Sequence, residues 1–299
     1  MSAPSPRSRF LAGIALRPVR VAGSLPFEVV GLALGQGASP LEVLVAESAA
    51  PPPSTALRSA WKTRNAGRAA PLLLIVLHQD RASLCGPAGD DPPAYPGLDR
   101  GQVERVCREA LEQPDRHAAL RSLRDVLPSL EADLPGLRNE GLLATHELRA
   151  GARLRPDWID AGRSARGALS RRGTELLRAL GFGIERCDGA TSILRAGERK
   201  VAVAVLLERD EAPELSAERF SGLSPITYAL SIADRENLDW VVVQHGAKLR
   251  IYPTRVGVGV GRRGRTETFI ECHAGLLPDS DAAYLWLLFS AQALVPGGT

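Results

Sequence analysis

The sequence predicts an α/β (α+β) protein built from a smaller first part and a larger second part. Apolar residues make up 44% and charged residues 24% of the chain, as in ordinary packed proteins. Short apolar runs typical of strands alternate with segments of helical spacing in both halves. A chain of 299 residues can bury two cores of ordinary size, and two is the expected number.

A small α/β domain is predicted over residues 1–99. Leu25–Leu34 and Leu41–Glu47 are apolar runs joined by a turn-rich segment, which indicates a β-hairpin. Pro71–Leu77 predicts a buried strand, and the ASLCGP segment after it predicts a return strand. Gly86–Gly97 is rich in Gly, Pro and Asp, so we expect a surface loop there.

A helical connector is predicted over residues 100–155. Val103, Val106 and Ala110 recur at helical spacing, and a second helix is expected from Asp115 until Pro128. The segment GARLRPDW closes this region and predicts a domain boundary.

Residues 156–299 carry the most informative order of elements. Two helices are expected, at Ser170–Leu180 and Pro225–Glu236. Between and after them, strands are expected at Gly183–Cys187, Ser192–Arg195, Lys200–Leu207 and, as a strand–turn–strand unit, within Leu238–Pro253. Lys200–Leu207 should be central, because its residues are apolar on both faces. Helix, three-strand meander, helix, strand, strand is the order of the PD-(D/E)xK nuclease core, so a restriction-endonuclease-like sheet flanked by helices is predicted, with a C-terminal hairpin and helix.

The two halves share a weak internal similarity. PLLLIVLHQDRASLCGP and WVVVQHGAKLRIYP both read as strand, turn, strand and closing proline. Each follows an apolar strand that ends in an acidic residue, Glu47 in one case and Glu208 in the other. Two divergent copies of one fold would explain this pattern, and so would the common sequence requirements of hairpins.

A PD-(D/E)xK site needs an Asp on the second core strand and an acidic-x-Lys on the third. The carboxylates hold Mg²⁺ and the Lys orients the attacking water. Here Thr and Ser stand where the Asp is expected, with Asp188 nearby, and Glu208 is followed by Asp210 where Lys is expected. The first helix offers Glu175. Two interpretations stay open: Asp188, Glu208 and Asp210 gather a metal, or the fold persists without catalysis, which we favour.

A glycine- and arginine-rich segment follows at Val256–Thr268. Its GxGxxG pattern precedes an alternating, strand-like sequence instead of a helix, so a dinucleotide site is not expected. A mobile loop that carries Arg262, Arg263 and Arg265 to a DNA backbone is one interpretation. A solvated hairpin tip is the other.

Composition narrows the remaining classes of function. The formal net charge of +3 is too small to indicate nucleic-acid binding by itself. The four cysteines lie far apart without a CxxC pair, so no zinc knuckle or disulfide framework is expected. The longest apolar run, Ala282–Val295, is shorter than the ~18–20 residues of a membrane span. We therefore expect a cytoplasmic protein.

Three segments together resemble a known family. LPGLRNEGLLATHEL, GTELLRALGF and LDWVVVQHGAKLRIYP, in this order, are similar to the N-terminal region of type IIG-like restriction–modification polypeptides, whose methylase domain is related to phage-exclusion methylases. The resemblance covers roughly residues 60–299 and rests on structural, not catalytic, motifs. It implies a nuclease-like front end that acts on DNA together with a methylase and a target-recognition domain or subunit.

Three functions follow from these expectations. The favoured one is a DNA-binding or scaffolding module of a restriction–modification or phage-defence system, without catalysis of its own and without a cofactor. The second is a Mg²⁺-dependent endonuclease with a migrated active site. The third is a protein-interaction domain.

Overall fold

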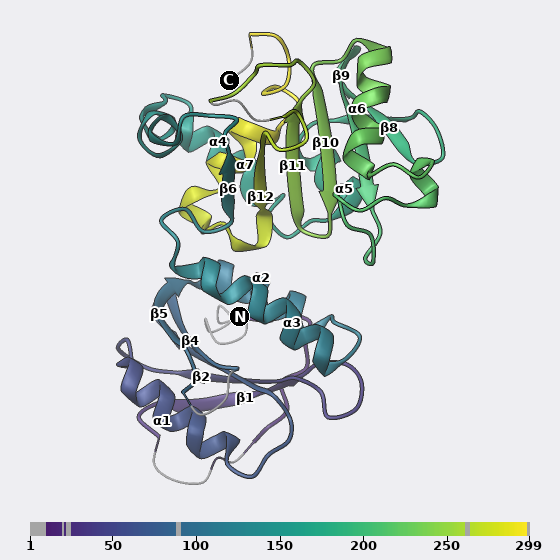
Figure 1. Cartoon of the computed structure of the whole chain (residues 1–299). Coiled ribbons are helices and arrows are strands. Elements are labelled where there is room, and N and C mark those ends of the chain that lie inside the picture. Colours follow the sequence, from purple (N-terminus) through teal and green to yellow (C-terminus); the bar gives the residue numbers. More distant parts are fainter. Residues whose placement is uncertain (1–9, 20, 22–24, 88–90, 261–263, 298–299) are drawn as a thin grey trace, which may run out of the picture. The chain divides into compact units, whose positions relative to one another are not determined.

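The computed structural model describes residues 10–19, 21, 25–87, 91–260 and 264–297 (Figure 1). The chain divides into two compact units, residues 1–135 and 136–299. Each unit has its own mixed sheet with helices, which confirms the α/β class.

Unit 1 contains a five-stranded sheet of order β1-β2-β3-β4-β5. The strands are β1 (Glu28–Leu34), β2 (Glu42–Glu47), β3 (Leu72–His78), β4 (Arg81–Cys85) and β5 (Ala94–Asp99). Only β2 and β3 are parallel among these neighbours, and α1 (Ser54–Asn65) connects them. The predicted hairpin and buried strand are confirmed. The loop expected at Gly86–Gly97 is wrong in its second half, because Ala94 and Tyr95 pair with β4.

Helices α2 (Arg100–Leu111) and α3 (Arg116–Val126) belong to unit 1. Asp99 and Asp115 cap them by accepting hydrogen bonds from backbone N–H groups of the first turn. The apolar face of α2 packs on β4 and β5. The structure therefore places one boundary at residues 135 and 136, where the sequence analysis expected boundaries at 99 and 155 around a separate connector.

Unit 2 contains a seven-stranded sheet of order β6-β12-β11-β10-β9-β8-β7. The strands are β6 (Leu137–Glu140), β7 (Gly183–Arg186), β8 (Thr191–Ala196), β9 (Arg199–Leu207), β10 (Trp240–His245), β11 (Lys248–Pro253) and β12 (Phe269–His273). The helices are α4 (Trp158–Arg166), α5 (Gly173–Ala179), α6 (Pro225–Glu236) and α7 (Ala283–Phe289). Strand β9 lies between β8 and β10, and Val201–Val205 is buried throughout, so the predicted central strand is confirmed.

Helix α6 lies over β9 and β10 on the near face of the sheet in Figure 1. Val203, Val205 and Val243 pack with Ala229 and Ala233 of this helix in one buried cluster. Helices α4 and α7 form a second contact, in which Ala161 meets Ala283 and Leu287. Because β9 and β10 are parallel, α6 is the crossover that their connection requires.

The two sheets share one topology over five consecutive strands. In both, an antiparallel hairpin leads through a helix into a parallel neighbour, which two further antiparallel strands follow. Strands β1–β5 correspond in this way to β8–β12, and α1 corresponds to α6. His78 pairs with Arg81 as His245 pairs with Lys248, across two-residue turns. This agreement supports the interpretation as two copies of one fold.

Glu47 and Glu208 do not occupy corresponding positions in the two sheets. Glu47 pairs with Leu77, one residue before His78. The corresponding residue in unit 2 is Leu206, which pairs with Gln244. Glu208 is therefore two positions further along and has no acidic counterpart in unit 1 at the same register.

Candidate polar site at the end of strand β9

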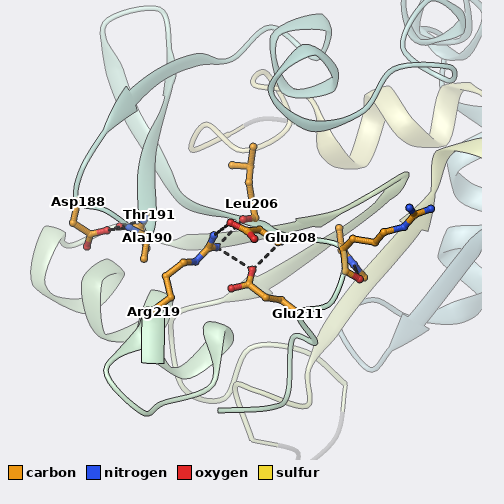
Figure 2. A network of polar contacts seen from close by, with 9 residues as sticks. Asp188, Ala190, Thr191, Leu206, Glu208, Glu211 and Arg219 are labelled. Carbon is orange, nitrogen blue, oxygen red and sulfur yellow. Dashed lines mark hydrogen bonds and ion pairs between the residues drawn. The ribbon is translucent and has the colours of Figure 1, made fainter. Parts of the chain in front are cut away.

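Two of the residues predicted to be catalytic, Asp188 and Glu208, lie at one end of the unit 2 sheet. Thr191 of β8 pairs with Val205 of β9, and Asp188 and Glu208 each lie three residues beyond that pair at the same end. Asp210 follows Glu208 in an exposed turn, and Glu175 is exposed in the first turn of α5. The pairing of β8 with β9 thus places Asp188 and Glu208 at the same end of the sheet (Figure 2).

Asp188 holds the turn between β7 and β8. Its Oδ1 accepts hydrogen bonds from the backbone N–H groups of Ala190 and Thr191, at 2.7 and 2.6 Å, and its Oδ2 accepts one from the Tyr228 hydroxyl at 3.1 Å. Burial raises the pKa of Asp188, but these hydrogen bonds outweigh it and the pKa lies below its usual value. Both carboxylate oxygens are therefore engaged in structure.

Glu208 and Glu211 share the guanidinium of Arg219. Arg219 Nη1 lies 3.5 Å from Glu208 Oε1, and Nη2 lies 3.2 Å from Glu211 Oε2. Nη2 also donates to the Leu206 carbonyl at 2.8 Å, and the Glu208 backbone N–H donates to Glu211 Oε2 at 2.8 Å. Figure 2 shows the guanidinium between the two carboxylates.

A short 3-10 segment, Glu218–Phe220, positions Arg219. The Phe220 side chain is fully buried, and the guanidinium carbon lies 4.7 Å from the centre of its ring. The fixed guanidinium therefore pairs with the largely buried Glu211 carboxylate and also lies beside the more exposed Glu208 carboxylate. In the part of the chain that the structure describes, no group of three or more His, Cys, Asp or Glu side chains is arranged to hold a metal ion.

Lys200 does not lie at the end of the sheet that carries Asp188 and Glu208. Lys200 lies at the beginning of β9, and its Nζ forms an ion pair with Glu236 Oε2 at 2.9 Å. Val205 lies near the other end of the strand, and Glu208 directly follows that end. Lys200 therefore does not replace the lysine of a PD-(D/E)xK site.

The glycine- and arginine-rich segment is only partly described. Arg262 and Arg263 lie outside the described residues. Arg265 is bound within unit 2: its Nη1 donates to Asp234 Oδ1 and to the Thr254 carbonyl, both at 2.7 Å. The structure thus uses Arg265 to hold the base of the segment, in place of the expected extension toward a phosphate.

Sequence analysis missed Glu211, Arg219 and Tyr228. Glu211 and Arg219 lie in the polar loop that precedes α6, where no periodic pattern marks a contact, and Tyr228 lies in the first turn of α6. The only available signal was the spacing of Glu208 and Glu211, three residues apart.

No family model matches the chain, and neither a curated protein nor a solved structure is significantly similar to it. Among the described helices, none has the length and apolar character needed to cross a membrane.

Proposed function

We propose that this chain is a nuclease-like module that binds DNA or serves as a scaffold in a restriction–modification or phage-defence system, and that it does not cleave DNA alone. One observation carries the absence of cleavage. The Arg219 guanidinium lies between Glu208 and Glu211, where a nuclease of this fold would hold Mg²⁺.

The order of elements supports the restriction-endonuclease-like part of the proposal. Unit 2 runs α5, β7, β8, β9, α6, β10, with an antiparallel meander and a parallel fourth strand. This is the succession expected for a PD-(D/E)xK core. A PD-(D/E)xK core would carry its acidic residues at the end of the sheet where β8 begins and β9 ends.

The acidic side chains at this end of β8 and β9 are already engaged within the protein. Mg²⁺ binds through oxygen ligands and needs them free of competing cations. Asp188 accepts three hydrogen bonds from the protein, and Glu208 has a guanidinium beside it. With Lys200 at the opposite end of β9, no lysine of that strand orients a water or offsets charge on the phosphate.

A Mg²⁺-dependent endonuclease with a migrated site is the second candidate. The observation in its favour is that Asp188 and Glu208 reach the same end of the sheet. In this reading Arg219 would have to leave the two glutamates before Mg²⁺ could bind.

The partners follow from the proposed system. They are DNA and a methylase or target-recognition domain or subunit, in the same chain or in another. A pure protein-interaction role would need neither DNA nor Mg²⁺.

Plasmid nicking in Mg²⁺ or Mn²⁺ tests the proposal. Wild type and Glu208→Ala are incubated with supercoiled DNA, beside an active nuclease as a positive control. We expect intact plasmid with both proteins. Cleavage by wild type that disappears in Glu208→Ala would reject the proposal in favour of the endonuclease.

A further inference from the structure

We propose that a cavity in unit 2 binds a nucleobase. The cavity has a volume of about 440 Å³, within the ~300–1,000 Å³ that is typical of small-molecule sites. It lies where β10 begins and β11 ends, and its lining includes Asp239, Trp240, Pro253, Arg255, Val258 and Leu294. Because Trp240 pairs with Ala202 near the beginning of β9, this Trp240 cavity lies away from the polar site at the end of β9. The proposal does not depend on the binding of duplex DNA.

Trp240 gives the cavity an aromatic surface. It is the first residue of β10, and Val241 and Val243 of the same strand pack in the cluster under α6. Side chains alternate between the two faces of a strand, so Trp240 lies on the face opposite α6. Trp240 is half-buried and lines the cavity, which leaves part of its side chain accessible to a ligand.

Two comparisons within the chain distinguish Trp240 from a core residue. Leu73 is its counterpart in unit 1, when β3 and β10 are aligned on their last histidines, and Leu73 is completely buried. Trp61 is also buried, and its indole N–H donates to the Leu72 carbonyl at 2.8 Å. Among the residues that the structure describes, none accepts a hydrogen bond from the Trp240 indole. Its N–H is therefore available to a ligand.

An ion pair supplies the polar groups of the cavity. Arg255 Nη2 lies 2.8 Å from Asp239 Oδ1, and the two side chains are 75% and 42% exposed. A guanidinium has five N–H donors and a carboxylate has two acceptor oxygens, so both groups can bind a ligand while they remain paired. The pair therefore presents a donor beside an acceptor, with no net formal charge.

The remaining lining is apolar and held in place by the fold. Pro253 and Leu294 are buried, and Val258 adds a more exposed apolar side chain. The Thr254 backbone N–H donates to the Asp239 carbonyl at 3.0 Å, which joins the two strand ends that carry the ion pair. A cavity that is formed before binding requires little ordering of side chains when a ligand enters.

A nucleobase has the features that this lining recognises. It is a flat ring that stacks on aromatic side chains, and its edge carries hydrogen-bond donors beside acceptors. A simple anion would not use the indole and would meet the Asp239 carboxylate. An aliphatic ligand would leave the ion pair without hydrogen bonds. A free nucleotide and a single-stranded DNA end both present such a base, whereas the bases of a duplex are stacked and paired.

NMR of the indole N–H groups tests the proposal on the whole chain. The sequence has four tryptophans, and Trp240→Phe identifies the signal of Trp240. The probes are the monophosphates of adenosine, guanosine, cytidine and thymidine, a single-stranded tetranucleotide, and benzyl alcohol as an aromatic ring without a base edge. The affinity of each variant is measured by saturation transfer to the nucleotide, and a thermal melt checks its folding.

We expect the nucleotides to shift the Trp240 signal. Trp240→Leu should weaken binding about 5- to 150-fold, as expected for the loss of one base–aromatic stack, and Trp240→Phe should keep most of the affinity. Trp286→Leu changes another half-buried tryptophan of unit 2, outside the cavity lining, and should bind as wild type does.

The ion pair has a matched control as well. Asp239→Ala/Arg255→Ala should weaken binding and reduce the difference in affinity among the four bases. Asp160→Ala/Arg163→Ala removes an exposed ion pair of α4 and should have no effect. Because Asp239 and Arg255 are partly exposed, this test does not depend on the folding of the Trp240→Leu variant.

The outcomes also identify the source of the base. A tetranucleotide that binds at least tenfold more tightly than the monophosphates supports a DNA end, and equal affinities support a free nucleotide. A Trp240 signal that does not move with any nucleotide at millimolar concentration would overturn the proposal. Equal shifts with benzyl alcohol would replace the nucleobase with an unspecific aromatic ligand. Neither of these two results bears on duplex binding, which is measured separately.

Discussion

The interpretation of the polar site at the end of β9 depends on Arg219. It is partly buried and holds Glu208, Glu211 and the Leu206 carbonyl together. Arg219→Ala should lower the free energy of unfolding by about 2 kcal/mol, because hydrogen bonds to charged groups contribute about 1.5–3 kcal/mol each and part of the loss is screened. Urea unfolding measures this. Arg199→Ala, at an exposed position, is the control, and equal stability of the two variants would contradict the account.

The lowered pKa of Asp188 predicts how the stability of the fold depends on pH. Its pKa in the folded protein is lowered, so its ionised form stabilises the fold above the unfolded pKa, and this stabilisation is lost as the pH falls through the folded pKa. Asp188→Asn should therefore be less stable than wild type at pH 7, and the difference should shrink toward acid pH.

Thermal unfolding from pH 7 to pH 2 checks this, with Asp210→Asn in the exposed turn as the control. A difference that is independent of pH would mean that the lost stability comes from packing instead of the charge of Asp188.

Only part of the candidate site could be predicted from sequence. The predicted strands were sufficient to place Asp188 and Glu208 at the same end of the sheet, because antiparallel pairing fixes which strand ends meet. Arg219 could not be predicted, since it reaches Glu208 across eleven residues of a loop without periodicity. Asp188 also binds Tyr228, forty residues away, through a contact that only the tertiary fold creates.

At the scale of elements, strands with dense apolar runs were predictable and weakly patterned elements were not. Strand β3 is buried along its whole length and β9 is buried from Val201 to Val205, so dense apolar runs mark both strands in the sequence. Strand β6, LRNE, has no buried residue and owes its conformation to pairing with β12. Helix α1 was missed although Leu57, Ala60 and Trp61 are buried at helical spacing, because prolines before it and polar residues after it obscure the pattern.

The pairing of β11 and β12 includes a largely buried ion pair. Arg250 of β11 binds Glu271 of β12, with side chains only 15% and 12% exposed, and its guanidinium also lies over the Phe269 ring. Removing one partner leaves a poorly solvated charge, which costs about 3–5 kcal/mol in buried pairs. Arg250→Met should therefore destabilise unit 2 by about 3 kcal/mol.

The comparison variant is Arg138→Met, which breaks the more exposed pair with Glu140 on β6 and should cost at most about 1 kcal/mol. Chemical denaturation of both variants makes the test. Equal losses would contradict the distinction between the two pairs.

At the scale of the molecule, each unit has a sheet and an apolar cluster of its own. The clusters do not share residues, and the division falls at residues 135 and 136. Fragments 1–135 and 136–299 should therefore each fold. Circular dichroism and urea unfolding of the separate fragments should give two cooperative transitions, and their far-ultraviolet spectra should sum to that of the whole chain. A fragment that remains unfolded would show that it needs its neighbour.

The proposed function is that this chain binds DNA and does not cut it. One experiment examines both parts in the same sample. A fluorescent duplex is incubated with wild type in Mg²⁺ at 50 mM salt, its anisotropy is recorded, and the same DNA is then run on a denaturing gel. We expect raised anisotropy and full-length strands. Unchanged anisotropy, or shortened strands that are lost with Glu208→Ala, would contradict the account.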